Sequence, residues 1–290
     1  MECPSPSPLD YFAALVRDDD SLSLTEAAGA IALAEYPGLD LAALQTELDE
    51  LAARLRRRLP ADAGALQRVR ALHQFFYRDL GFGGNVNDLR DADNSHLHAV
   101  LQRRRGLPIA LAVLYLDLAG QVGLQADGVS FPGHFLIKLH LPLGEAVIDP
   151  VDGRSLTRAE LEERLEPFLG RETRFELESG MGLGELLGDY LQPASGREIL
   201  ARMLRNLARL HREDGDLLRL LQIQQRQVVL EPEDWSLRRD RGQTLAALGQ
   251  TEAAIADLAL YLQRAGGPAD GPRVAAQLAA LREAGPPRWH

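Results

Sequence analysis

The sequence predicts an α+β fold in two parts: a helical N-terminal part joined to a small antiparallel sheet, and then an all-α region of helical repeats. Three observations support this fold class. Apolar residues recur at three- and four-residue spacing along most of the 290-residue chain, which indicates amphipathic helices. Short alternating apolar runs near the middle are typical of strands. Similar segments recur 34 residues apart near the C-terminus.

The first part of the chain is predicted to be helical. Residues 9–59 carry Ala and Leu at helical spacing, with a break at the Tyr-Pro-Gly sequence of residues 36–38. A second helical stretch, LQRVRALHQFFYRDL, ends at Gly81 and precedes a loop of Gly, Asn and Asp that extends to about Asn94. The segments LHAVLQRRR and LPIALAVLYLDLAGQV then predict two helices separated by Gly106. The second is apolar most of the way round, so we expect it to be buried.

Three short strands are predicted next, at GVSF (128–131), FLIKLHL (135–141) and EAVID (145–149). The sequences Pro132-Gly133 and Pro142-Leu143-Gly144 separate these strands and are typical of hairpin turns. We therefore expect an antiparallel sheet that packs on the buried apolar helix.

After about Gly180 the sequence is helical again and contains a repeat. Each unit reads as a helix, a turn with glycine and a second helix, and Pro232 closes the first unit, a pattern that resembles the tetratricopeptide repeat. Two units and a partial third are few for a free-standing array, because each repeat buries its face on a neighbour. We expect the array to pack on the first domain; the alternative is a helical bundle with accidental spacing. The residues that correspond at an offset of 34 are Gly215 and Gly249, Ala208 and Gly242, Leu220 and Ala254, and Val228 and Leu262.

These patterns predict a leader at residues 1–9, a first domain at 10–185 and the repeats at 195–290. The leader contains Pro and Ser and is expected to be disordered. It holds the single cysteine, Cys3, so we expect neither an intramolecular disulfide nor a thiolate zinc cage.

The composition limits the classes of partner. The formal net charge of −10 makes a diffuse attraction to nucleic acid or to an anionic membrane unexpected. The basic clusters Arg56–Arg58 and Arg103–Arg105 are interpreted as solvated helix ends. The leader lacks the charged and apolar regions of a secretory signal, and no run of about 18 apolar residues occurs, so we expect a cytoplasmic protein.

His134 and Asp149 are the candidate catalytic residues. His134 precedes an alternating apolar run and Asp149 ends the next one, so neighbouring strands would deliver two members of a nucleophilic triad. A turn centred on residues 143 and 144 would leave Asp149 opposite residue 138, so side-chain contact would need a bulge or a slip. The alternatives are a structural histidine and an Asp-Pro turn.

The order of these parts resembles the transglutaminase-like fold, which is related to papain-type proteases. In that fold a cysteine at the start of a buried helix meets a His and an Asp from consecutive strands. The helix start favours a thiolate through its unpaired amides and dipole. In the stretch GLPIALA (106–112) the cysteine position is Pro108, and Cys3 lies about a hundred residues too early. The resemblance therefore implies that His134 and Asp149 are vestigial, with no nucleophile identified.

A more specific resemblance covers the chain from about residue 25 onward. The segments RRRGLPI, FPGHFLIKL and IDPVDG, followed by REILARMLRNL and helical repeats, resemble the bacterial SirB family. Members of that family resemble a transglutaminase-like domain joined to tetratricopeptide repeats, and they commonly have Gly-x-Pro where active relatives have Gly-x-Cys. The resemblance implies a pseudoenzyme with a role in protein–protein interaction.

Residues near the predicted cleft are candidate binding residues, namely Asn94, Ser95, Arg105, Gly106 and Pro108. Asn94 and Ser95 have an alternative role as the N-cap of the helix LHAVLQRRR. His96 and His98 do not have the spacing of a metal site on one helix face, so no metal and no cofactor are expected.

Two functions from different classes remain. The first is a non-catalytic binding or regulatory module in which the cleft holds a protein or peptide partner and the repeats provide a second surface. The second is a hydrolase or acyl-transfer enzyme that uses His134 and Asp149 with water or with an unrecognised nucleophile, for which Ser95 and Ser130 are the nearby hydroxyls. The missing cysteine favours the first, because a His–Asp pair alone forms no covalent intermediate.

Overall fold

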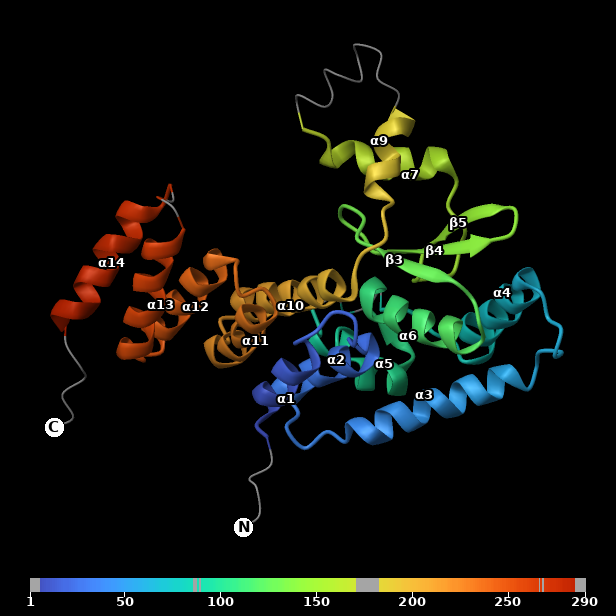
Figure 1. Cartoon of the computed structure of the whole chain (residues 1–290), viewed down its shortest axis with the longest axis horizontal. Helices are drawn as coiled ribbons and strands as arrows, with labels where there is room; N and C mark the ends of the chain where they lie inside the picture. Colours follow the sequence, from blue (N-terminus) through green and yellow to red (C-terminus); the bar gives the residue numbers. More distant parts are fainter. Residues whose placement is uncertain are drawn as a thin grey trace. The chain divides into compact units, whose positions relative to one another are not determined.

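Figure 1 shows the computed structural model of the chain, which describes residues 6–85, 88, 90–170, 183–265, 267 and 269–284. Cys3 lies outside the described residues, and helix α1 already begins at Pro8, inside the predicted leader. The chain divides into two compact units. We call them the repeat unit, formed by Met1–Leu22, Ala30–Gly38 and Ala201–His290, and the sheet unit, formed by Ser23–Gly29 and Leu39–Leu200.

The chain is mostly helical. Up to residue 190 the described elements are α1 (Pro8–Leu15), α2 (Leu24–Ile31), η1 (Ala32–Ala34), α3 (Leu41–Arg56), α4 (Ala65–His73), η2 (Gln74–Asp79), β1 (Gly83–Gly84), η3 (Ala92–Asn94), α5 (Leu97–Arg103), β2 (Arg105–Gly106), α6 (Pro108–Gln121), β3 (Ala126–Val129), β4 (Leu136–Leu141), β5 (Gly144–Ile148), α7 (Arg158–Leu165), η4 (Glu166–Phe168) and α9 (Leu183–Tyr190). The remaining elements are α10 (Gly196–Glu213), α11 (Leu217–Leu230), α12 (Trp235–Ala247), α13 (Thr251–Arg264) and α14 (Gly271–Ala284).

Helix α6 forms the core of the sheet unit. It begins at Pro108, whose fixed φ and missing amide hydrogen suit the first position of a helix. Its side chains are buried along most of its length, as the apolar pattern predicted. Helices α3, α4 and α5 and strands β3 and β4 all contact it (Figure 1). The predicted packing of the sheet on this helix is therefore confirmed.

The three-stranded sheet is antiparallel in the order β3-β4-β5, which confirms the predicted α+β class. Strand β3 ends at Val129 rather than Phe131, because Phe131 starts a turn and its carbonyl accepts the amide of His134 at 3.2 Å. A second sheet pairs β1 with β2 in parallel. It was not predicted, since two residues per strand carry no alternating pattern.

The repeat unit contains the predicted repeats. Helices α10 to α13 form two helix–turn–helix pairs, and α14 packs on α13. Gly215 and Gly249, which correspond in the repeat, both lie in turns with φ near +72° and +73°. A Cβ atom at Gly242 would lie 2.9 Å from Leu258, so the close crossing of α12 and α13 requires glycine there.

The N-terminal helix belongs to the repeat unit rather than to the sheet unit. Helix α1 and the 3₁₀ helix η1 both contact α11, so residues that the sequence assigned to the first domain pack on the repeats. Glu35 joins this contact: its Oε1 lies 3.0 Å from His211 Nε2 and its Oε2 lies 3.3 Å from Arg219 Nε. The side chains of Glu35 and His211 are both 4% exposed.

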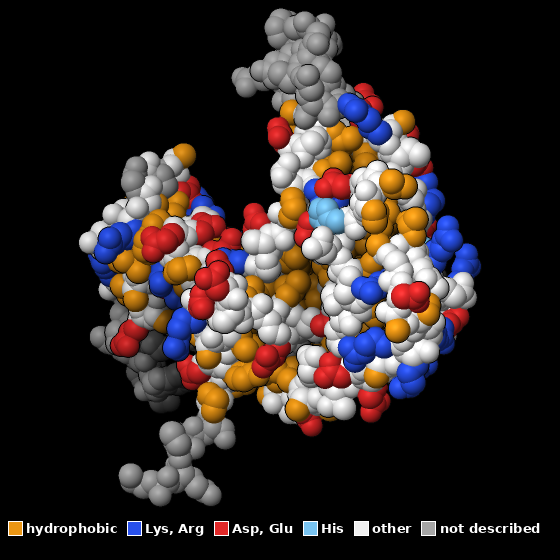
Figure 2. Space-filling model, turned by 45° about the vertical axis from the view of Figure 1, so that its right-hand side comes forward, with side chains coloured by type: hydrophobic (Ala, Val, Ile, Leu, Met, Phe, Trp, Pro, Cys, Tyr) orange, Lys and Arg blue, Asp and Glu red, His pale blue; other side chains and the backbone are white. Residues whose placement is uncertain are grey.

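The two basic clusters lie at the ends of α3 and α5 and are mostly exposed, as expected, and some of their arginines also contact the protein. Arg103 forms ion pairs with Asp91 and Asp93, and Arg104 lies over the ring of Phe82. In the first cluster Arg56 donates to the carbonyl of Gln121 at 3.3 Å, and Arg58 lies over Phe75 and pairs with Asp79. Acidic and basic side chains are interspersed over the face drawn in Figure 2. Within the described residues, the structure has no helix with the length and apolarity needed to span a bilayer.

Candidate functional site

His134 is positioned by the turn that leads into β4. Pro132 and Gly133 occupy the centre of this turn, where Pro presets φ and Gly133 adopts a φ of 69°, the arrangement of a type II turn. Because β4 begins only at Leu136, His134 lies two residues before the first paired residue of the strand.

Asp149 is brought to the same place by the register of the hairpin. Leu141 pairs with Gly144 and Ile137 with Ile148, so the turn is Pro142-Leu143, one residue earlier than the expected centre. One further step places Asp149 opposite Leu136, and His134 projects from the same face because side chains alternate. No bulge is needed. The expectation that Asp149 lies opposite residue 138 was wrong because it placed the turn too late.

The carboxylate of Asp149 accepts three hydrogen bonds. Its Oδ1 lies 2.9 Å from His134 Nε2 and 3.1 Å from the amide of Val151, and its Oδ2 lies 3.0 Å from Arg164 Nη1. The side chain is only 9% exposed. Burial alone would raise the pKa of Asp149. The hydrogen bonds from His134, Val151 and Arg164 outweigh this effect and lower the pKa to about 2.

The ionised carboxylate determines which ring nitrogen of His134 must carry a proton. A carboxylate only accepts hydrogen bonds, so Nε2 of His134 must carry a proton and Nδ1 is the lone-pair nitrogen of the neutral ring. Within the described part of the chain, Nδ1 has no hydrogen-bond partner. The side chain of His134 is 25% exposed, so this nitrogen is available to a bound group or to water.

The loop after Asp149 is closed by its own backbone. The amide of Gly153 donates to the carbonyl of Asp149 at 2.8 Å, and the amide of Asp149 donates to the carbonyl of Arg154 at 2.9 Å. Gly153 has a φ of 74°, and a Cβ atom there would lie 2.4 Å from the ring of Tyr77 and 2.5 Å from that of His73. The loop that carries Asp149 is therefore fixed against the end of α4 and η2.

Two tyrosines lie behind the loop. Within the described residues, the buried hydroxyls of Tyr77 and Tyr115 have no hydrogen-bond partner, and the two rings are 6.1 Å apart. Burial raises the pKa of both hydroxyls, and for Tyr77 the charges of Tyr115 and Asp149 raise it further. Both tyrosines therefore stay neutral, and their buried hydroxyls are unsatisfied donors.

Strand β1 links the Asp149 loop to the start of α6. The amide of Gly84 donates to the carbonyl of Val151 at 3.2 Å, and Gly84 pairs in parallel with Gly106. A Cβ atom at Gly84 would lie 2.7 Å from Val151, which shows how closely the loop approaches. The loop after Asp149 and the residues before Pro108 are thus held on either side of β1. That the histidine faces the first turn of α6 remains a prediction.

The candidate binding residue Asn94 is bound within the protein. It is 1% exposed, its Nδ2 donates to the carbonyl of Asp88 at 2.6 Å, and its Oδ1 accepts from Asn85 at 2.9 Å. Its backbone carbonyl accepts the amide of Leu107 at 2.8 Å. Ser95 is 3% exposed. Asn94 therefore supports the start of α6, Ser95 is buried, and a role of either in ligand contact stays a prediction.

Neither Asn94 nor Ser95 caps α5, so that alternative was wrong. The N-cap is His96, and Asn94 ends the short helix η3, because the chain makes an extra turn before α5 begins. His96 therefore precedes the helix. The centres of the His96 and His98 rings are 5.9 Å apart, although two helical residues at this spacing would point to different faces. Among the described residues, no three His, Cys, Asp or Glu side chains are grouped as metal ligands.

Gly106 and Arg105 also have structural contacts. A Cβ atom at Gly106 would lie 2.7 Å from Val100, so the segment between α5 and α6 requires glycine. Arg105 donates through Nη1 to the carbonyl of Arg104 at 2.8 Å and to that of Gly81. This arginine is therefore used to hold the loop before β1.

Arg164, Tyr77 and Tyr115 were not found by sequence reasoning. Arg164 lies in α7, whose sequence RAELEERL has the capping box of an ordinary surface helix and gives no signal for one arginine. Tyr115 is seven residues after Pro108, two turns along the same face of α6, so helical spacing from the nucleophile position could have indicated it.

Comparison with known proteins agrees with this architecture. A model described as transglutaminase-like superfamily matches residues 42–205, and a tetratricopeptide-repeat model matches residues 207–280. A 72-residue stretch, 25% of this chain, is 42% identical to human F-box only protein 21 and covers 12% of that protein. None of the solved structures matches the chain significantly.

Bacterial relatives match over most of the chain. The UPF0162 protein of Xylella fastidiosa strain Temecula1 is 36% identical over 247 residues, which cover 85% of each chain. The UPF0162 protein of Pseudomonas aeruginosa is 33% identical over 210 residues, which cover 72% of this chain and 73% of the relative. With these matches over a fold of this kind, the chain belongs to the transglutaminase-like superfamily and, within it, to the UPF0162 proteins.

Proposed function

We propose that this chain is a non-catalytic transglutaminase-like protein of the SirB type, which binds a protein or peptide partner and uses its helical repeats as a second interaction surface. The observation that carries the proposal is Pro108 at the first position of α6. The superfamily resemblance puts the nucleophilic cysteine there, and proline has no side-chain nucleophile and no amide hydrogen.

The surroundings of Asp149 also disfavour catalysis. In a triad the Asp stabilises the imidazolium that forms when the His takes a proton. Here Arg164 binds the second oxygen of the same carboxylate at 3.0 Å. This guanidinium competes with an imidazolium at His134 for one negative charge, which disfavours the charge separation of a general-base step.

A binding role accounts for the intact His134–Asp149 pair and for the repeats. The exposed side of His134 offers a nitrogen to a bound group, and the repeats belong to a class that usually mediates protein interactions. The proposal includes a cytoplasmic location and no requirement for a cofactor, a nucleic acid or a membrane. It treats the His–Asp pair as a support of the cleft rather than as catalytic groups.

The proposal is tested by turnover of generic glutamine-amide and peptide substrates. We expect no turnover by the wild type, and the same result for Cys3→Ser. Wild-type activity that disappears in Cys3→Ser would overturn the non-catalytic assignment. The partner is sought by pull-down from a cell lysate with the full chain and with a version that lacks the repeats. Partners that bind through the repeats should be captured by the full chain and lost from the version without repeats.

A water-dependent hydrolase is the second candidate. The observation that favours it is the intact bond of 2.9 Å between His134 and Asp149, with Nδ1 of the histidine accessible. In that case His134 takes a proton from water at Nδ1 while Asp149 holds Nε2. Activity that survives Cys3→Ser but is lost in His134→Ala identifies this mechanism.

A further inference from the structure

The tip of the β4–β5 hairpin and the first turn of α4 form an apolar groove. Leu66 of α4 and Leu141 to Gly144 of the hairpin line a cavity of about 320 Å³, and Gly64 to Gln67, Arg70 and Pro142 line an adjoining one of about 560 Å³. Both volumes fall in the range of roughly 300–1,000 Å³ that is typical of ligand sites. We call these two cavities together the hairpin groove.

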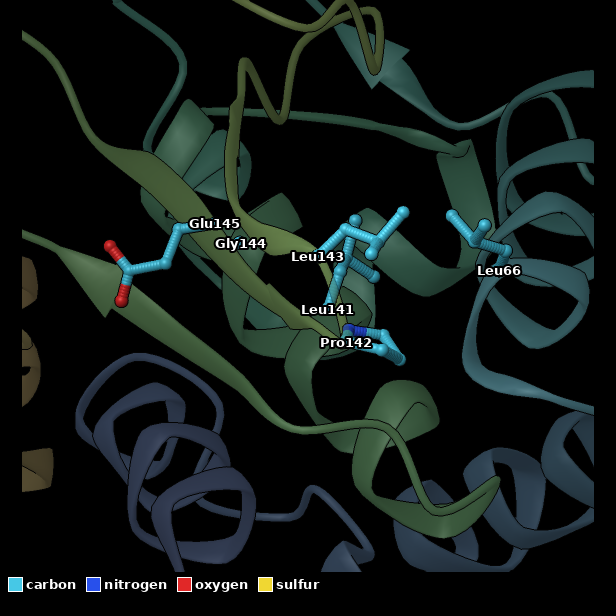
Figure 3. A pocket seen from close by; sticks show the side chains of 6 residues that line it. All are labelled: Leu66, Leu141, Pro142, Leu143, Gly144 and Glu145. Atoms are coloured by element: carbon cyan, nitrogen blue, oxygen red, sulfur yellow. The ribbon is translucent and has the colours of Figure 1, made fainter.

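Two leucines are exposed on opposite walls of the groove. Leu143 is 95% exposed and Leu66 is 49% exposed, and in Figure 3 their side chains point toward one another across the gap, with Pro142 below Leu143. The two-residue turn itself does not explain Leu143, because such turns favour Gly, Asn or Asp. An apolar side chain that packs on nothing at a hairpin tip indicates a contact with another molecule.

The charges around the groove are unequal. Glu145 points away from Leu66 in Figure 3, and it is already countered by Lys138 at 3.7 Å. Arg70, at the other end, is exposed, and its guanidinium has no ion pair or hydrogen bond to any described residue. The uncompensated charge at the groove is therefore positive, in a chain whose net charge is −10.

We propose that the hairpin groove is a docking site for a peptide segment that carries a large aliphatic side chain followed by a carboxylate. The aliphatic group enters between Leu66 and Leu143, and the carboxylate pairs with Arg70. This site lies at the far end of the hairpin from His134 and Asp149, five residues along β4 or about 16 Å, so it is separate from that pair.

The test uses fluorescence anisotropy with the full chain and three labelled peptides in one Gly/Ser frame. The probe contains Leu-Leu-Asp-Asp, and its counterparts contain Leu-Leu-Asn-Asn and Leu-Leu-Lys-Lys. We expect the Asp peptide to bind most tightly and the Lys peptide most weakly. Leu143→Ser should weaken binding of the Asp peptide about tenfold, since it removes an apolar side chain that becomes buried on binding. Arg70→Glu should weaken the Asp peptide about fivefold and leave the Asn peptide nearly unchanged.

Matched controls separate the groove from general surface effects. Leu218→Ser changes another leucine that is 64% exposed, and Arg57→Glu changes another exposed arginine whose side chain binds no described residue. Neither control should alter binding. Equal affinity for all three peptides, or a loss caused equally by the controls, overturns the proposal. A change of oligomeric state in Leu143→Ser, measured by light scattering, also overturns it, because the groove would then bind a second copy of the chain.

Discussion

The buried carboxylate of Asp149 should make the sheet unit sensitive to acid. Its pKa is about 2 in the folded chain, against 3.8 for an aspartate in its ordinary, solvated state. Because the folded pKa is depressed, the resulting stability is fully present above pH 3.8 and is lost as the pH falls toward 2. A difference of nearly two pKa units corresponds to about 2.5 kcal/mol at pH 7, and to roughly half of that at pH 3.

Asp149→Asn removes this contribution while keeping the shape of the side chain. We expect the variant to lose about 2 kcal/mol at pH 7 and only about 1 kcal/mol at pH 3, because the wild type has by then lost the rest. All other carboxylates titrate alike in both proteins, so the difference between them isolates Asp149. Asp152→Asn is the matched control on the same loop, where the exposed carboxylate accepts one backbone bond at 2.9 Å.

Urea denaturation followed by two probes measures the effect. Far-UV circular dichroism follows both units. Tryptophan fluorescence follows the repeat unit through Trp235 of α12, and the sequence of the sheet unit contains no tryptophan. The fluorescence transition should be identical in wild type and Asp149→Asn, and only the dichroism should shift. A loss below about 0.5 kcal/mol at pH 7, or a loss that does not shrink at pH 3, would refute this account of the carboxylate.

Three further outcomes are expected. Gly153→Ala should destabilise the sheet unit by at least about 2 kcal/mol, because φ is +74° and the new Cβ would meet two aromatic rings. Gly120→Ala in α6 is the control; it has open space around it and should be neutral or stabilising. Thermal denaturation compares the two variants. Glu35→Gln should destabilise the repeat unit by about 1–3 kcal/mol through the buried bond to His211, measured by tryptophan fluorescence in urea. Pro108→Cys should not create strong amidase activity, because a base misplaced by about 1 Å already costs on the order of a hundredfold; rapid turnover of a glutamine-amide substrate would contradict this.

Much of the fold follows from periodicity. Helix α6 is buried nearly all round and was predicted as such, and the alternating runs place β4 and β5 within a residue or two of their true ends. The spacing of Gly215 and Gly249 indicated the repeats, because a glycine with positive φ is needed at each turn. The position of α1 could not be predicted, because it packs on α11, about two hundred residues later in the sequence. The local pattern of apolar residues predicts a helix but not its distant packing partner.

The candidate site was only partly predictable. The order of His134 and Asp149 along the chain, with a hairpin between them, was enough to expect them near each other. The turn was placed one residue too late, which shifted the expected partner of Asp149 by two residues, because both Pro142-Leu143 and Leu143-Gly144 read as turns in sequence. Arg164 arrives from a helix that follows the sheet, so its bond to Asp149 depends on tertiary packing that the residues of α7 do not encode locally.

The bonds of Asp149 bear on the choice between the two functions. One oxygen closes the turn through the amide of Val151, and the other holds α7 through Arg164, so the carboxylate supports the loop independently of any reaction. Removing it would leave three partly buried donors without their acceptor, which costs stability. Selection for stability alone is therefore sufficient to retain Asp149 after a nucleophile is lost, and the intact His–Asp pair is not by itself an argument for catalysis. The discriminating atom is Nδ1 of His134, which no described residue uses and which only a ligand or a reaction would need.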